Sequence, residues 1–201
     1  MDAVLSGYIG TAETGAVLAE AVACVKAQNA NAIYCCDPVM GDIGPGAFVK
    51  PDVPPFFVDT AISLAEIVTP NVFELSILTG MPASDLASLP TLVTAGRALI
   101  KRGPCVVLVT SAHIGGDVRI ATLAVTAEHA WRVCTPYIPL TPMPNGMGDC
   151  IAALLLGRYL QHRDIALALD TFGFSGGNTS LGVPIVTRAV NSCADGKRLR
   201  F

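Results

Sequence analysis

The sequence predicts an α/β fold in which helices flank a mostly parallel sheet. Short apolar runs alternate along the chain with segments whose apolar residues recur at helical spacing. The run at 105–109 is apolar throughout, as expected for a strand of a parallel sheet that is covered on both faces. Alternating strands and helices are typical of α/β domains. Ligands of such domains bind at the carboxyl ends of the strands, so the polar residues that follow apolar runs are candidates for a site.

Local patterns predict the elements one by one. Strands are expected at 3–5, 32–36, 66–68 and 105–109, with a hairpin at 118–126 and 130–134. Helices are expected at 13–28, 52–65, 71–78, 92–102 and from the glycines near 146 to Tyr159. Gly80 is expected to end the third helix, and the glycines and proline of 41–50 indicate a mobile loop. We expect a single domain over 1–201, with an irregular tail at about 161–201.

The composition excludes several classes of protein. Hydrophobic residues make up 52% of the chain and charged residues 14%, with a net charge of −3. No basic cluster offers a footprint for nucleic acid, and charges interrupt every apolar stretch before about 18 residues, so no membrane span is expected. The start lacks the features of a signal peptide. Seven cysteines without a Cys-x-x-Cys pair favour a reducing, cytoplasmic environment.

A glycine turn at 145–150, Asn-Gly-Met-Gly-Asp-Cys, is followed by an apolar helical run. Gly146 and Gly148 let backbone N–H groups approach an anion closely, and the helix places its partial positive end at the same point. Asp149 in the first helical turn would repel a phosphate unless it takes the proton of an attacking hydroxyl. The combination suggests a small-molecule kinase. The alternative is a plain turn whose aspartate caps the helix.

Three further motifs place polar residues after predicted strands. Asp37 and Asp42 bracket Asp-Pro-Val-Met-Gly-Asp, which fits charge management around a metal–nucleotide complex, or else a solvated Asp-Pro turn. Asn71 and Glu74 lie three apart at a helix start, where both can face one ion or form a capping box. A threonine–serine pair at 110–111 follows the strongest strand. Its hydroxyls fit nucleotide phosphates or a monovalent cation, or simple strand termination.

Taken in order, these motifs resemble those of pyridoxal kinases of the ribokinase-like superfamily. The stretches concerned are Ser-Gly-Tyr at 6–8, Asp-Pro-Val-Met-Gly-Asp at 37–42, Thr-Pro-Asn-Val-Phe-Glu at 69–74, Val-Leu-Val-Thr-Ser at 107–111 and Gly-Met-Gly-Asp at 146–149. The resemblance covers about 2–159. It implies a ribokinase-like fold and ATP-dependent phosphorylation of the 5′-hydroxyl of pyridoxal.

The resemblance also implies a role for each motif. Asp149 would be the base that deprotonates the hydroxyl, and the backbone N–H groups of Gly146, Met147 and Gly148 would form the anion hole. The residues implied for ATP and Mg²⁺ are Asp37, Asp42, Asn71, Glu74, Thr110 and Ser111, with Asp37 and Glu74 as those that organise the metal. Thr69 and Thr110 would help to hold a monovalent cation, K⁺. Tyr8 would pack on the pyridine ring, and 41–50 would be a flap over ATP, with Phe48 near its aromatic position.

The chain departs from the family's pattern at both ends. The family ends in amphipathic helices, whereas the stretch 171–178 of this chain is glycine-rich and its tail is irregular. The family has an N-terminal section before the position of Met1, which carries its first strands, dimer-forming lid and contacts to the pyridine ring. The chain therefore resembles a truncated pyridoxal kinase, and we expect it to be a poor enzyme. Family members form homodimers. Hydroxymethylpyrimidine kinases share the fold but have Gly-x-Gly-Cys at the anion hole, whereas Asp149 precedes Cys150 here. A non-catalytic nucleotide-binding remnant is the alternative from another class.

Overall fold

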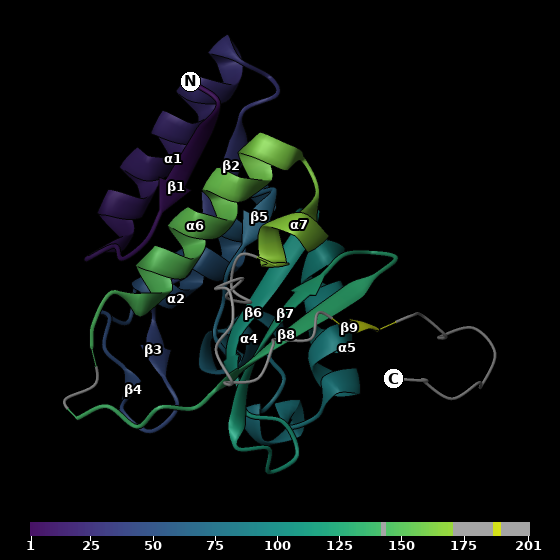
Figure 1. Ribbon diagram of the computed structural model, residues 1–201. Coiled ribbons are helices and arrows are strands. Elements are labelled where there is room, and N and C mark those ends of the chain that lie inside the picture. Colours follow the sequence, from purple (N-terminus) through teal and green to yellow (C-terminus); the bar gives the residue numbers. More distant parts are fainter. Residues whose placement is uncertain (142–143, 171–186, 190–201) are drawn as a thin grey trace.

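The computed structural model of the chain describes residues 1–141, 144–170 and 187–189 (Figure 1). Within these residues a mixed sheet has the strand order β1-β2-β5-β6-β7-β8-β9. The first four of these are parallel and the later pairings are antiparallel. The strands are β1 Ala3–Ser6, β2 Ile33–Cys36, β5 Ile67–Val68, β6 Val106–Ala112, β7 Arg119–Val125, β8 Ala130–Pro136 and β9 Thr187–Ala189. The predicted class, a mostly parallel sheet flanked by helices, is confirmed.

The helices bury the two faces of this sheet separately. They are α1 Ala12–Gln28, α2 Val53–Phe56, α3 Ile62–Leu64, α4 Val72–Thr79, α5 Leu89–Ile100, α6 Met147–His162 and α7 Ile165–Asp170. Tyr34 and Cys36 of β2 face a core formed with α1 to α5, whereas Ile33 and Cys35 face a core formed with α6 and α7. Figure 1 shows α6 and α7 lying together over their face of the sheet. Because successive strand residues point to opposite faces, the unbroken apolar runs seen in the sequence fill both cores.

Local capping explains where the helices begin and end. Thr11 caps α1 by accepting a hydrogen bond from the N–H of Thr14. Ser88 forms a capping box with Thr91, so α5 starts at Leu89, before the expected position 92. Gly80 ends α4 in the left-handed conformation, with φ of +72°, as predicted. Glycine adopts this backbone conformation readily because glycine has no Cβ.

The helix expected at 52–65 is interrupted by a π-helical segment, Phe57–Ala61, between α2 and α3. Arg102, just after α5, bridges this segment to α4. Its guanidinium donates hydrogen bonds to the carbonyl oxygens of Leu78, at 2.7 Å, and of Val58. A π-helical turn alters the pairing of main-chain carbonyls, and here the carbonyl oxygen of Val58 accepts a hydrogen bond from an arginine in the turn after α5.

Three expectations are wrong in detail. The segment at 41–50 contains a short antiparallel hairpin, β3 Gly41–Asp42 with β4 Gly46–Ala47, where a loop was expected. Strand β6 continues to Ala112 through a register shift instead of ending at 109. Helix α7 and strand β9 lie within the expected irregular tail. The glycine-rich stretch at 171–178 lies outside the described residues.

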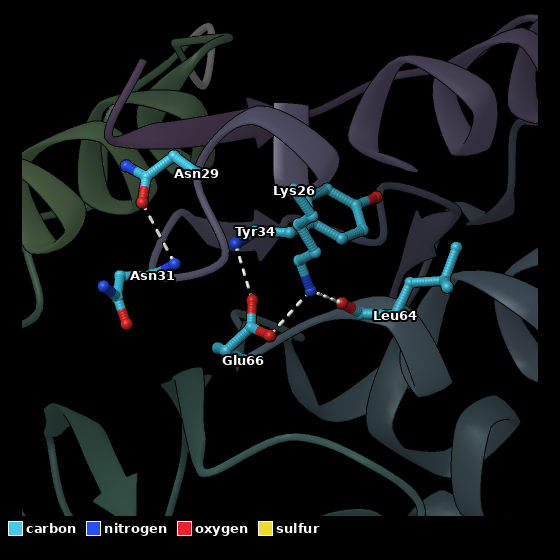
Figure 2. A network of polar contacts seen from close by, with 6 residues as sticks. All are labelled: Lys26, Asn29, Asn31, Tyr34, Leu64 and Glu66. Carbon is cyan, nitrogen blue, oxygen red and sulfur yellow. Dashed lines mark hydrogen bonds and ion pairs between the residues drawn. The ribbon is translucent and has the colours of Figure 1, made fainter. Parts of the chain in front are cut away.

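A polar network ties α1 to the amino ends of β2 and β5 (Figure 2). The ammonium group of Lys26 donates 2.6 Å hydrogen bonds to the Leu64 carbonyl oxygen and to Oε1 of Glu66. The other oxygen of Glu66, Oε2, accepts a 2.7 Å bond from the N–H of Tyr34. In the same view, Asn29 caps the turn before β2 by accepting a bond from the N–H of Asn31. The network fixes β2 and β5 at the end opposite to the polar motifs.

Among the helices of the described ranges, none combines the length and the apolar character that crossing a membrane requires. The six cysteines in this part of the chain are free thiols.

Candidate active site

The predicted motifs meet because they follow neighbouring parallel strands. The N–H of Asp37 donates to the Ser6 carbonyl oxygen at the end of β1, and the N–H of Thr69 donates to the Cys36 carbonyl oxygen at the end of β2. Beyond the end of β5, Asn71 forms one more parallel bridge with Thr110 of β6. The main chain thus carries the sheet past its apolar strands and lines up their polar ends at a single edge.

Asp37 is the buried carboxylate at the centre of this edge, with 5% of its surface exposed. Its Oδ1 accepts a 2.9 Å hydrogen bond from the Thr69 hydroxyl, and within the described residues no hydrogen bond reaches its Oδ2. Burial raises the pKa of Asp37 to about 6, the bond from Thr69 opposes this, and the negative charge of Asp149 adds to it. A cation beside Oδ2 would relieve both the desolvation and the repulsion.

The glycine turn brings Asp149 to the same place. Gly146 caps α6 with a φ of +81°, and its carbonyl oxygen accepts the N–H of Cys150 at 3.0 Å. A Cβ built on Gly148 would lie 3.7 Å from Oδ2 of Asp37, and one built on Gly7 would lie 2.9 Å from Oδ1 of Asp149. The turn, the helix start and two carboxylates therefore form one cluster with the end of β1.

Glu74 and Asn71 form the capping box that the sequence offered as an alternative. The Glu74 N–H donates to Asn71 Oδ1, and Glu74 Oε2 accepts the N–H of Asn71, both at 2.9 Å. The box also holds the hairpin: Glu74 Oε1 accepts the N–H of Met40 at 3.0 Å, and the Asn71 amide donates to the Gly41 carbonyl oxygen at 2.8 Å. Burial raises the pKa of Glu74 to about 8, against three backbone hydrogen bonds that lower it. Both carboxylate oxygens of Glu74 thus face backbone N–H groups.

Most of the remaining candidate residues are exposed at the surface. The Tyr8 side chain is 59% exposed, and Phe48 in the segment expected to be a flap is 56% exposed. Asp42 is exposed, and its Oδ1 accepts the N–H of Ile43. Thr110 is buried, whereas Ser111 is exposed at the β6 bulge with a φ of +53°. The bulge interrupts the regular alternation of side chains between the two faces of the strand at Ser111.

Mg²⁺ fits the carboxylates of Asp37 and Glu74 only as an ion that keeps most of its water ligands. The described residues contain no group of three or more His, Cys, Asp or Glu side chains placed to hold a metal. Mg²⁺ is commonly held by one or two carboxylates together with substrate phosphates and water. Asp37 fits such a role through its available Oδ2. Glu74 fits only an indirect role, without direct contact to the metal, because its oxygens already accept hydrogen bonds from Met40 and Asn71.

Two residues of the cluster received no role from the sequence. Gly7 lies under Asp149, and Met40 donates its N–H to Glu74. A glycine directly after a strand is a sign of close backbone approach, and that sign was available for Gly7 within the Ser-Gly-Tyr stretch. Met40 contributes only a main-chain group, which no side-chain pattern reveals.

Comparison with known proteins identifies the class of fold and then the family. The structure aligns with a phosphomethylpyrimidine kinase homologue from Bacteroides thetaiotaomicron, solved with pyridoxal, at a TM-score of 0.75 and 25% identity, covering 85% of this chain and 59% of that one. Pyridoxal kinase from Leishmania donovani in complex with ADP and ginkgotoxin aligns at a TM-score of 0.73 and 25% identity, covering 84% and 59%. The fold is the ribokinase-like α/β fold.

The chain belongs to the phosphomethylpyrimidine kinase family, whose sequence model matches residues 1–171. Within the curated relatives, pyridoxal kinase PdxY from Deinococcus radiodurans is 47% identical over 167 residues, which are 80% of this chain and 55% of that protein. The chain thus spans about half the length of this relative.

Proposed function

We propose that this chain carries the nucleotide-binding and catalytic part of an ATP-dependent kinase that phosphorylates the 5′-hydroxyl of pyridoxal. The observation that carries the proposal is the position of Asp149. It lies in the first turn of α6, directly after the Gly146–Gly148 turn and beside the buried Asp37. The 47% identity to a pyridoxal kinase supports the choice of substrate.

The glycine turn would bind the phosphoryl group in transfer. Gly146, Met147 and Gly148 begin α6, and the first N–H groups of a helix have no partner within it. These donors and the helix dipole favour an anion at this point. Because the donors belong to the main chain of a packed helix, they are in place before the phosphate arrives, which is the condition for effective stabilisation of developing charge.

Asp149 would take the proton of the acceptor hydroxyl. A general base must lie within hydrogen-bond reach of that proton, and the exposed side chain of Asp149 is open to a substrate over the end of β1. Tyr8 follows Gly7 at the same strand end and is exposed enough to pack on a pyridine ring. A base and an aromatic ring at the same strand end suit a small heterocycle that carries a hydroxymethyl group.

The acidic residues would manage the charge of the nucleotide. Mg²⁺ bound with ATP would neutralise the phosphate oxygens during transfer. Asp37 would hold the hydrated ion, and Glu74 would support it through its anchoring of Asn71 and Met40. Asp42, Thr110 and Ser111 would border the nucleotide, and Thr69 with Thr110 would help to hold K⁺. A homodimer, as the family resemblance implies, and a cytoplasmic location, as the cysteine pattern favours, complete the proposal. The free thiols of the described part fit a reducing compartment.

The direct test is ATP-dependent phosphorylation by the purified 201-residue chain, with pyridoxal and 4-amino-5-hydroxymethyl-2-methylpyrimidine as competing acceptors. Transfer to pyridoxal in preference to the pyrimidine supports the proposal. The pyrimidine is the second candidate, because the matching family model is that of phosphomethylpyrimidine kinase, and preference for it would replace the first. ATP binding without transfer to either acceptor would identify a nucleotide-binding remnant.

A further inference from the structure

The end of β1 approaches the proposed base more closely than any side chain would allow. A Cβ on Gly7 would lie 2.9 Å from Oδ1 of Asp149, and Cβ atoms essentially never come within 3.0 Å of another heavy atom. The two residues come from opposite ends of the described chain. Helix α6 packs against β1, so the approach is part of the fold and not a chance meeting of two loops.

The backbone of Gly7 is held on both sides. Ser6 is buried, its hydroxyl shares a 2.9 Å hydrogen bond with the hydroxyl of Tyr34, and its carbonyl oxygen accepts the N–H of Asp37. Ile9 is buried two residues further on, with 4% of its surface exposed. Because these anchors fix the chain around Gly7, a side chain at this position would displace Asp149 and not the strand.

The carboxylate of Asp149 is the part that can yield. It is the far end of an exposed side chain, so turning it away costs the fold little. On the other side of the turn stands Asp37, whose Oδ2 lies 3.7 Å from a Cβ position on Gly148 and whose pKa responds to the charge of Asp149. The glycine therefore leaves room for the carboxylate over the strand end, in a place that a Cβ on Gly7 would close.

We infer that Gly7 is a positioning residue: its missing side chain lets the Asp149 carboxylate lie directly over the end of β1, where the acceptor hydroxyl is bound. The inference rests on the proposed function for its consequence in catalysis, but the displacement itself does not. Gly7→Ala moves the base out of line while the nucleotide contacts of the glycine turn remain. A misplacement of about 1 Å can cost about 10²-fold in rate, so kcat falls by about that factor.

The matched control is Gly10→Ala. Gly10 lies in the same loop between β1 and α1, and a Cβ built on it meets nothing within 4 Å. Neither Gly7 nor Gly10 has a backbone φ in the range that disfavours alanine, so the backbone at both positions can accept the substitution. The comparison separates the effect of a methyl group beside Asp149 from the general effect of replacing a glycine in this loop.

The experiment measures three quantities for the unmodified chain, Gly7→Ala and Gly10→Ala. Crystal structures give the position of the Asp149 carboxylate, steady-state kinetics give kcat and the KM for ATP, and thermal unfolding gives Tm. In Gly7→Ala we expect a displaced carboxylate, a kcat lower by about 10²-fold, and a KM for ATP and a Tm like those of Gly10→Ala.

Two results would overturn the inference. One is a Gly7→Ala structure in which Asp149 keeps its place, and the other is a variant whose Tm or ATP affinity falls together with kcat, which would mark Gly7 as a residue of the fold alone. If the unmodified chain transfers no phosphoryl group, the proposed function fails for this chain. The crystal structures still decide whether Gly7 sets the place of Asp149.

Discussion

The Thr69 hydroxyl donates a 2.9 Å hydrogen bond to Oδ1 of Asp37, joining the end of β5 to the end of β2. The bond favours the ionised carboxylate, yet burial and the charge of Asp149 outweigh it, and the pKa of Asp37 stays raised. The site therefore keeps a destabilised negative charge at neutral pH. Such charge is a recurring property of functional sites, and it leads to the first prediction.

Asp37→Asn is expected to stabilise the fold at neutral pH. The pKa of Asp37 rises from 3.8 to about 6 on folding, so folding favours the protonated acid. The contribution of the protonated acid to the free energy of unfolding is therefore fully present below pH 3.8 and is lost as pH rises through about 6. At pH 7.5 the variant should be more stable by on the order of 2 kcal/mol. Urea unfolding between pH 4 and pH 8 measures the difference. Asp42→Asn, an exposed aspartate of the same motif, is the control, and a less stable Asp37→Asn at pH 7.5 would contradict the argument.

Asp149→Asn is expected to lower phosphoryl transfer by about 10²–10⁴-fold, the usual effect of removing a general base. ATP binding should survive, because the donors proposed for the phosphate are backbone N–H groups of the Gly146–Gly148 turn. Steady-state kinetics and calorimetric titration with an ATP analogue measure the two effects. Asp59→Asn, an exposed aspartate of the π-helical segment, should change neither. Ordinary turnover by Asp149→Asn would show that this residue is not the base.

Glu74→Ala is expected to destabilise the chain and loosen the hairpin. The substitution removes the acceptors of two N–H groups, those of Met40 and Asn71. Each buried donor left without a partner costs about 1–3 kcal/mol. Hydrogen exchange should accelerate at both amides, and urea unfolding should show the loss. Ser76→Ala on the same helix removes only a bond from a side chain to a carbonyl oxygen and serves as the control. Unchanged exchange at Met40 would show that Glu74 does not hold the hairpin.

The network of Figure 2 should respond unequally to loss of its two charged members. Lys26 and Glu66 form an ion pair at 2.6 Å whose side chains are 29% and 38% exposed, so Lys26→Met should cost less than about 1 kcal/mol. Glu66→Ala should cost more, about 1–3 kcal/mol, because the N–H of Tyr34 also loses its acceptor. A double-mutant cycle measured by chemical unfolding separates the two terms. Equal losses for both single variants would refute this division.

The sequence was sufficient for features that depend on local pattern. The strand at 32–36, the left-handed end of α4 at Gly80 and the helix that opens after Gly146 all follow from residues within a few positions of one another. The capping box of Asn71 and Glu74 was readable for the same reason. Parallel topology then brings the strand ends to one edge, which is why Asp37 and the glycine turn could be expected to meet.

Features that depend on distant contacts were not readable. The hairpin at Gly41–Ala47 is held by Asn71 and Glu74, about thirty positions further on. The bulge that exposes Ser111 arises from pairing with β7, because the register between β6 and β7 shifts between Val109 and Ala112. The contact between Gly7 and Asp149 joins residues that only the packing of α6 on β1 brings together. In each case the local sequence permits several conformations and a remote partner selects one.

The shared anchoring of the hairpin and α4 has a consequence for recombining this chain with its relatives. Glu74 and Asn71 hold the main chain at Met40 and Gly41, so the segments 37–47 and 69–74 behave as a single exchangeable unit. A crossover between them would join the hairpin segment of one parent to the Asn71 and Glu74 side chains of the other. The main-chain groups at Met40 and Gly41 would then meet side chains that are placed for a different backbone. Chimeras should therefore place their junctions before 37 or after 74, and a library built by shuffling should be depleted of survivors with junctions between these positions.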